Sequence, residues 1–174
     1  MVGATLVLLC FSERSEAETV SSSACELPAG LARKVANTYP DTGLVSLSDL
    51  DEYHRRLFRE DNGQGCPGLV SVDLFGDGEP TWALVLLQRG PSKRTATLVV
   101  ASALEQGWKL EELDVADASP VPVVWRDNPG KYVDFHGQKT LQAHHPVIVL
   151  CGYESWAIVY AWTGKTVEKI WISD

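Results

Sequence analysis

The chain has 174 residues, of which 45% are hydrophobic and 22% charged, and its formal net charge at pH 7 is -8. This composition is ordinary for one soluble domain, and a chain of this length buries most of its apolar surface without extra cross-links. The acidic balance, with a sequence pI of about 5.0, argues against nucleic acid as a partner, because a phosphate-binding surface needs an excess of Lys and Arg. It suits a basic protein partner, which an acidic surface attracts over a distance.

An uncharged run from Gly3 to Phe11 is followed by the polar stretch Ser12–Ser23. The run is too short to span a bilayer and is typical of the hydrophobic part of a secretory signal, although basic residues before it are missing. We therefore expect residues 1–24 to be a signal peptide or mobile N-terminus, residues 25–174 to form a single domain, and the mature protein to be periplasmic or secreted. No other run approaches the length of a membrane span.

Removal of that segment leaves Cys25, Cys66 and Cys151. Cys25 and Cys66 both lie beside turn or loop residues, and in an oxidising compartment we predict a disulfide between them that joins the N-terminal helices to the first strand. Cys151 follows the apolar run Val147–Leu150 and is interpreted as a buried thiol. A nucleophile there would need a base, and the pair His144-His145 lies roughly 20 Å away along the predicted strand. No catalytic residue is predicted.

Two helices are predicted before Cys66. Apolar residues at helical spacing favour a helix from Pro28 to Asn37, and Pro28 suits the first helical turn. Ser48, with Asp51 three residues later, is a capping signal for a second helix that ends near Glu60. The expected buried face of that helix consists of Leu50, Tyr53, Leu57 and Phe58. Its expected solvent face consists of His54, Arg55, Arg56 and Arg59.

Beyond Cys66 the hydrophobic period changes to that of strands. The predicted strands are 70–74, 81–87, 95–103, 108–115, 123–126, 132–135, 146–151, 154–162 and 166–172. Short turns join the first four, which predicts an antiparallel meander, because parallel pairing would need long crossover connections. The predicted fold class is therefore α+β, with two N-terminal helices packed on a largely antiparallel, meandering β-sheet.

Two segments of the chain, Gly78–Gly90 and Gly152–Gly164, align without a gap and share Gly, Trp-Ala, Val and a final Gly. Either a hairpin has been duplicated, or two strands of similar composition have converged. In the second segment the aromatic residues fall on one face of a strand, which either closes a core or is partly exposed as a recognition surface. The residues predicted to bind a partner are Tyr153, Glu154, Trp156, Tyr160 and Trp162.

The turn Asp73–Glu79 carries clustered carboxylates between two apolar strands. It resembles the calcium loop of FG-GAP and related β-propeller repeats, and the matching residues are Asp73, Gly76, Asp77, Gly78 and Pro80. The metal hypothesis makes Asp73, Asp77 and Glu79 ligands of Ca²⁺. Phe75 and Thr81 stand at two oxygen positions of the pattern, and calcium needs six to eight oxygens, so weak or absent binding is expected. A tight turn, with glycines at positive φ and Asp in local hydrogen bonds, explains the same residues.

The chain after residue 24 also resembles small exported proteins of unknown function from Gram-negative bacteria. The resemblance rests on Cys25-Glu-Leu-Pro28, Cys66-Pro-Gly68, the acidic turn and an ending that combines Trp162-Thr-Gly-Lys165 with Ile170-Trp-Ile-Ser-Asp174, and it implies no activity. No nucleophile elbow, phosphate loop or dinucleotide fingerprint occurs. The first hypothesis is therefore an exported, non-enzymatic binding protein, an inhibitor or immunity-type protein acting on another protein. The alternatives are a calcium- or ligand-binding structural module that uses the Asp73–Glu79 turn, and a hydrolase with an unrecognised site.

Overall fold

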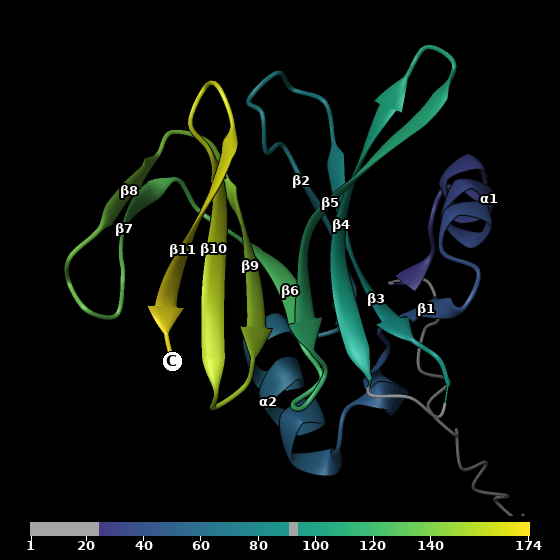
Figure 1. Ribbon diagram of the computed structural model, residues 1–174, viewed down its shortest axis with the longest axis horizontal. Helices are drawn as coiled ribbons and strands as arrows, with labels where there is room; N and C mark the ends of the chain where they lie inside the picture. Colours follow the sequence, from purple (N-terminus) through teal and green to yellow (C-terminus); the bar gives the residue numbers. More distant parts are fainter. Residues whose placement is uncertain (1–24, 91–93) are drawn as a thin grey trace, which may run out of the picture.

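A computed structural model of the chain describes residues 25–90 and 94–174, and the expected signal segment lies outside them. The prediction of an α+β fold with antiparallel strands is confirmed (Figure 1). The helices are α1 (Ala29–Thr38) and α2 (Glu52–Asn62), with a 3₁₀ turn at Leu47–Asp49 between them. The strands are β1 (Thr42–Leu44), β2 (Leu69–Val72), β3 (Thr81–Gln88), β4 (Thr95–Leu104), β5 (Gly107–Asp117), β6 (Val123–Asp127), β7 (Gly130–Val133), β8 (Thr140–Ala143), β9 (Val147–Gly152), β10 (Trp156–Trp162) and β11 (Val167–Ser173). Within the described residues, no helix combines the length and the hydropathy that a membrane crossing requires.

The strands divide into two larger sheets and a separate hairpin. The first sheet has the order β1-β3-β4-β5, and β2 pairs with the beginning of β3 while β1 pairs with its end. The second sheet has the order β11-β10-β9-β6, and β7 pairs with β8. The predicted four-strand meander is confirmed as β2-β3-β4-β5. The sequence pattern did not predict β1 and β8, which are only three and four residues long.

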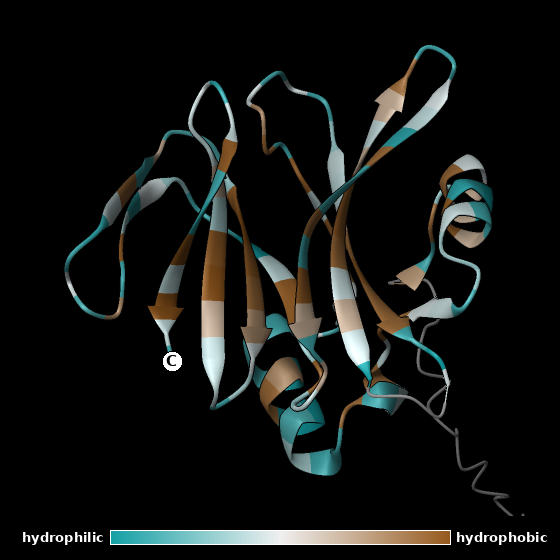
Figure 2. Cartoon of the chain, viewed as in Figure 1, coloured by the Kyte–Doolittle hydropathy of each residue, from teal (hydrophilic) through white to brown (hydrophobic). Residues whose placement is uncertain are grey.

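The two larger sheets face each other across a shared apolar core. The first sheet contributes Ala83, Val85, Leu87, Leu98 and Val100, and the second contributes Val124, Ile148, Leu150, Ile158 and Tyr160. The residues that alternate with these along each strand point to the outer faces of the two sheets. These outer faces are buried as well. This double burial explains why β3 and β9 are nearly continuous apolar runs (Figure 2).

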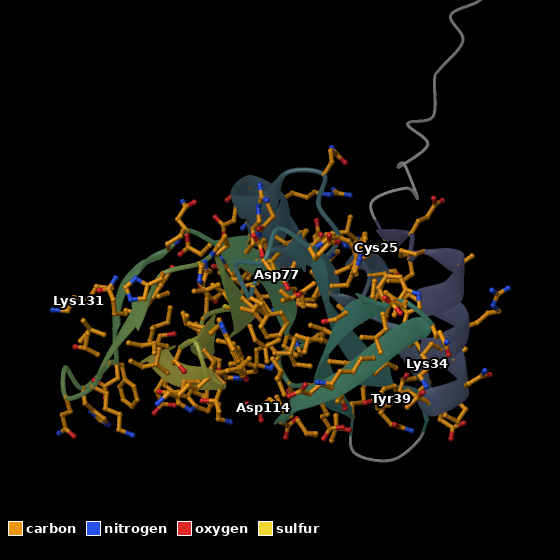
Figure 3. All side chains as sticks on the ribbon, turned by 90° about the horizontal axis from the view of Figure 1, so that it is seen from above. Cys25, Lys34, Tyr39, Asp77, Asp114 and Lys131 are labelled. Carbon is orange, nitrogen blue, oxygen red and sulfur yellow. A yellow bond between two sulfur atoms is a disulfide. The ribbon has the colours of Figure 1, made fainter. Side chains whose placement is uncertain are left out.

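Helices and the hairpin cover the outer faces of the two sheets. Leu31 and Val35 of α1 pack against Leu84, Leu86 and Val99 of the first sheet. The outer face of the second sheet is covered by Leu141 and Ala143 of β8 and by Phe58 of α2. The hairpin and α1 therefore lie at opposite ends of the molecule, as the positions of Lys131 and Lys34 indicate (Figure 3).

The two similar segments form strands β3 and β10, each of which lies between two neighbours in its sheet. Their aligned residues face different ways, however. Ala83 and Val85 point into the core between the sheets, whereas the aligned Ala157 and Val159 belong to clusters on the outer face. The aromatic face of β10, which includes Trp156 and Tyr160, points into the shared core. The likeness in sequence therefore does not extend to equivalent burial.

Helix α2 corrects three details of the prediction. It begins after Asp51, whose carboxylate accepts the backbone N–H of His54 at 2.9 Å, and so Ser48 is not its cap. Tyr53, expected in the core, is 41% exposed. Arg55, expected in solvent, is half-buried and donates to the carbonyl oxygens of Leu47 and Leu50. Arg55 is drawn inward by carbonyl acceptors in and just after the 3₁₀ turn, and Tyr53 faces outward to Glu154, so neither position follows from a helical pattern alone.

Candidate functional site

Two tryptophan rings lie close together where β10 begins and β11 ends. The ring centroids of Trp156 and Trp171 lie 6.0 Å apart, because Trp171 pairs with Ile158 in the register of the two strands. The backbone N–H of Phe135, just beyond β7, donates to the carbonyl oxygen of Trp171 at 3.1 Å. We call the surface formed by Phe135, Trp156 and Trp171 the aromatic edge.

The aromatic edge combines exposed rings with a firmly held one. Trp171 is 39% exposed and Phe135 is 44% exposed. Trp156 is half-buried, and its indole packs closely on Gly152. A Cβ added to Gly152 would lie 2.8 Å from Nε1 of Trp156 and 3.0 Å from Cγ of Pro120. The edge therefore offers apolar surface to solvent on a rigid base, and rigid aromatic side chains are typical of binding hot spots.

The turn between β9 and β10 is held against α2 by Tyr153. Its ring is stacked between His54 and Trp125, with centroid distances of 6.1 and 6.3 Å. Its hydroxyl lies 3.2 Å from a carboxylate oxygen of Asp61 and donates to it. Burial, followed by the nearby charge of Asp61, raises the pKa of Tyr153. This predicted binding residue therefore anchors the turn from inside the molecule.

Glu154 lies at the exposed tip of the same turn. Its φ of 57° is in the left-handed region, which is uncommon for a residue other than glycine. Its carboxylate accepts a hydrogen bond of 2.5 Å from the hydroxyl of Tyr53, and the guanidinium of Arg56 lies 5.2 Å from the centre of the Tyr53 ring. A Tyr, an Arg and a Glu therefore lie together on the surface beside the strand that begins with Trp156.

Tyr160 is a buried link between three strands. It is 2% exposed, and its hydroxyl donates to Oδ2 of Asp114 in β5 at 2.5 Å, while Lys169 in β11 donates to the same oxygen at 2.6 Å. Burial raises the pKa of Tyr160, and its hydrogen bond to Asp114 raises that pKa further. Partial burial also opposes ionisation of Asp114, but the hydrogen bonds from Lys169 and Tyr160 outweigh it and lower the pKa of Asp114.

This link predicts an acid-dependent loss of stability. Because the pKa of Asp114 is lower in the folded chain than in the unfolded chain, its contribution is fully present above about pH 4 and is lost as the pH falls through the folded pKa. We expect Asp114→Asn to lose less stability than the wild type between neutral pH and pH 3. Thermal unfolding across that range measures the difference, with Glu105→Gln as an exposed control. The prediction would be contradicted if the melting temperatures of the wild type and of Asp114→Asn fell by the same amount over this pH range.

Trp162 lies at the other end of β10. It is half-buried, and its ring meets that of Phe75 edge to face at 5.2 Å. Since β10 rises about 3.3 Å per residue, Trp162 is roughly 20 Å from Trp156 along the strand. The structure therefore brings Tyr153, Glu154 and Trp156 together at one end of β10, leaves Tyr160 inside the molecule and places Trp162 apart from them.

Two carboxylates of the Asp73–Glu79 turn, those of Asp73 and Asp77, accept hydrogen bonds from the turn's own backbone. Asp73 accepts the N–H groups of Gly76 and Gly78 at 2.8 and 3.2 Å, and Asp77 accepts that of Glu79 at 3.0 Å. Gly76 and Gly78 have φ values of 71° and 84°, as a tight turn requires. Within residues 25–90 and 94–174, no group of three His, Cys, Asp or Glu side chains is arranged to hold a metal ion. Asp77 also lies apart from Asp114 (Figure 3).

The predicted disulfide between Cys25 and Cys66 is present and joins the segment before α1 to the segment before β2. Cys151 is a buried free thiol. Burial, followed by the nearby charge of Asp61, raises the pKa of Cys151 to about 12. A thiol that stays protonated at neutral pH is a poor nucleophile, which agrees with the interpretation of Cys151 as a core residue.

The sequence pattern did not identify Phe135, Trp171 or Tyr53 as site residues. Trp171 stands in a strand of mixed polarity, and only its pairing with β10 brings it to Trp156. The one available signal was the number of aromatic residues near the end of the chain. Comparison with known proteins finds no matching family model, no matching curated protein and no matching solved structure. The likeness to small exported proteins of unknown function stays a prediction.

Proposed function

We propose that this protein binds a basic protein partner through the aromatic edge, as an inhibitor or immunity-type protein would. The observation that carries the proposal is the position of Trp171, which is 39% exposed and touches the half-buried Trp156. Scattered single apolar residues are normal on a protein surface, but a group of them is a feature of interaction sites. Phe135, whose backbone N–H donates to Trp171, and Val133, two residues before it, are also exposed, at 44% and 43%.

The chemistry of the surrounding surface supports protein recognition. Trp, Tyr and Arg dominate binding hot spots, and Tyr53 with Arg56 lies beside the turn that leads to Trp156. The net charge of -8 favours a basic partner, because opposite charges speed association and exclude wrong partners. The aromatic edge would provide most of the binding energy, and the acidic surface would speed association with the basic partner.

We also propose that the protein acts outside the cytoplasm, in the periplasm or as a secreted protein. The Cys25–Cys66 disulfide supports this location, because disulfides persist mainly in oxidising compartments. Mass spectrometry of the protein from its native source, with and without alkylation of free thiols, measures the fraction of protein that carries the bond. Recovery of the reduced form alone from intact cells would contradict the proposal.

Replacing Trp171 by alanine is expected to weaken partner binding by about tenfold or more, because the variant loses a central aromatic contact. The partner is first located with a photo-crosslinking amino acid at position 171, in extracts of the organism that encodes the chain. The same amino acid at Leu104, which is 57% exposed on the β4–β5 hairpin, serves as the matched control. The affinities of Trp171→Ala and Leu104→Ala for the identified protein are then measured by calorimetry.

The proposal predicts that the cross-linked protein is basic and that binding weakens as salt is added. It also predicts that Leu104→Ala binds like the wild type. Equal cross-linking at both positions, or an unchanged affinity in Trp171→Ala, would contradict the aromatic edge as the binding surface. An acidic partner would contradict the role of the net charge.

A further inference from the structure

A cavity of about 230 Å³ opens beside the aromatic edge, between the start of α2 and the connection from β5 to β6. It is lined by Asp49, Leu50, Asp51, His54, Arg94, Ala118, Ser119, Pro120 and Val121. Pro120 joins it to the aromatic edge, since Pro120 and the indole of Trp156 both lie against Gly152. Pockets for drug-sized ligands measure about 300–1,000 Å³, so this cavity suits a single side chain.

His54 holds the carboxylate of Asp51 in place at this cavity. Its Nδ1 lies 2.7 Å from Oδ2 of Asp51, and its ring is stacked on the buried ring of Tyr153. The hydrogen bond from the backbone N–H of His54, followed by that from its ring, lowers the pKa of Asp51 although desolvation opposes the shift. An ionised carboxylate only accepts hydrogen bonds, so Nδ1 of His54 donates to Asp51.

The carboxylates of Asp49 and Asp51 in the lining differ in their exposure and in the hydrogen bonds that they already accept. Asp49 has a side chain only 8% exposed, and its oxygens accept from Arg89 at 2.6 and 3.2 Å and from Ser46 at 2.9 Å. The side chain of Asp51 is 62% exposed. Its charge is therefore open to a ligand, although two of its acceptor sites bind His54.

The rest of the lining suits an alkyl chain with a charged end. Leu50, Pro120 and Val121 offer apolar contacts, and the carboxylate of Asp51 lies beside them. Among the described residues of the lining, Arg94 is the cation, and it is exposed. Such a long side chain can keep its charge in water and leave the cavity free.

We propose that this cavity receives a lysine or arginine side chain of the basic partner, with the alkyl stem on Leu50 and Val121 and the cationic head on the carboxylate of Asp51. This inference rests on the proposed function and adds the residue type that the partner inserts beside the aromatic edge. A charge-assisted hydrogen bond to Asp51 gives the selectivity. The site therefore selects a donor with a positive charge over a neutral or negative group of similar length.

The test uses three probes with the same backbone: the N-acetyl, N-methylamide derivatives of lysine, norleucine and glutamate. Binding to the whole chain is followed by NMR, through the amide signals of Ala118 and Val121 and the ring nitrogens of His54. We expect the lysine derivative to bind at least about threefold more tightly than the norleucine derivative, and the glutamate derivative to bind more weakly than both. A preference for the glutamate derivative would overturn the proposal.

Two variants give opposite expected shifts. Asp51→Asn should weaken binding of the lysine derivative at least about threefold, while the helix stays capped because Asn is as good an N-cap as Asp. Arg94→Gln removes a competing positive charge and should strengthen that binding. Asp77→Asn, in the Asp73–Glu79 turn, is the matched control and should change nothing. Weaker binding in Arg94→Gln, or unchanged binding in Asp51→Asn, would overturn the proposal.

Two further measurements distinguish a partner side chain from a free diamine, and the cavity from the aromatic edge. Tighter binding of putrescine than of the lysine derivative would assign the cavity to free diamines and overturn the role of a partner side chain. Trp171→Ala should leave binding of the lysine derivative unchanged. Failure of the lysine titration therefore contradicts the cavity alone, whereas unchanged partner affinity in Trp171→Ala contradicts the aromatic edge alone.

Discussion

Replacing both Cys25 and Cys66 by alanine is expected to lower the free energy of unfolding by about 4 kcal/mol. The disulfide closes a loop over a sequence separation of 41 residues, and the chain-entropy model gives roughly 4 kcal/mol for a loop of this length. The loop contains both helices, so the unfolded chain without the bond gains freedom over the whole segment that forms α1 and α2.

Urea unfolding of the double variant, compared with the wild type, measures this loss. Wild-type protein unfolded in the presence of a reductant is the matched control and should behave like the variant, since it lacks the same covalent bond. We expect the midpoint to fall without a loss of native secondary structure, because α1 still buries Leu31 and Val35 against the first sheet. A change below about 1 kcal/mol would show that the bond does not constrain the unfolded chain as the chain-entropy model requires.

Replacing Gly68 by alanine is expected to destabilise the fold by about 3 kcal/mol. A Cβ on Gly68 would lie 2.5 Å from the carbonyl oxygen and 2.7 Å from the nitrogen of Val45. Both atoms belong to backbone that cannot move aside easily, because the N–H of Val45 donates to Val85 at 3.0 Å and the N–H of Val85 donates to Gly68 at 2.8 Å. The added methyl group must therefore separate the segments that meet at β3.

The position of Gly68 extends the effect to the second sheet. The preceding residue, Pro67, accepts the N–H of Val124 in β6 at 2.8 Å, so the Cys66-Pro-Gly68 segment connects the two sheets. Thermal and urea unfolding measure the loss of stability. Gly130→Ala is the matched control, since nothing lies within 4 Å of its added Cβ and its φ is not in the left-handed region. Equal stability of the two variants would contradict the role of Gly68 at the junction.

Local features of the sequence were enough to predict most elements of the fold. Strands β2 to β5 follow from alternating or continuous apolar runs separated by turn residues, because side-chain period and turn chemistry are properties of short segments. The α2 region shows the limit of a local pattern. Its helix was expected at the right place, but the burial of Arg55 and the exposure of Tyr53 depend on the 3₁₀ turn and on Glu154, which lies far away in the sequence.

The candidate site could be predicted only in part, for a related reason. Trp156, Tyr153 and Glu154 belong to one turn and strand, so a local pattern could select them together. Trp171 and Phe135 join Trp156 only through the β10–β11 register and a single backbone hydrogen bond. The cavity likewise takes His54 and Pro120 from segments that no local pattern connects. Nothing in the local sequence of either segment indicates that they meet.

The sequence by itself determined the α+β class, the antiparallel meander, the acidic charge and the choice of cysteines for the disulfide, because each of these depends on composition, local period or short turns. The tertiary structure alone decided that the strands divide into two facing sheets, that Tyr160 is buried while Trp171 is exposed, and that a cavity lies beside Trp156. These outcomes depend on which strand edges and faces meet, and that choice follows from packing across the whole chain rather than from any one segment.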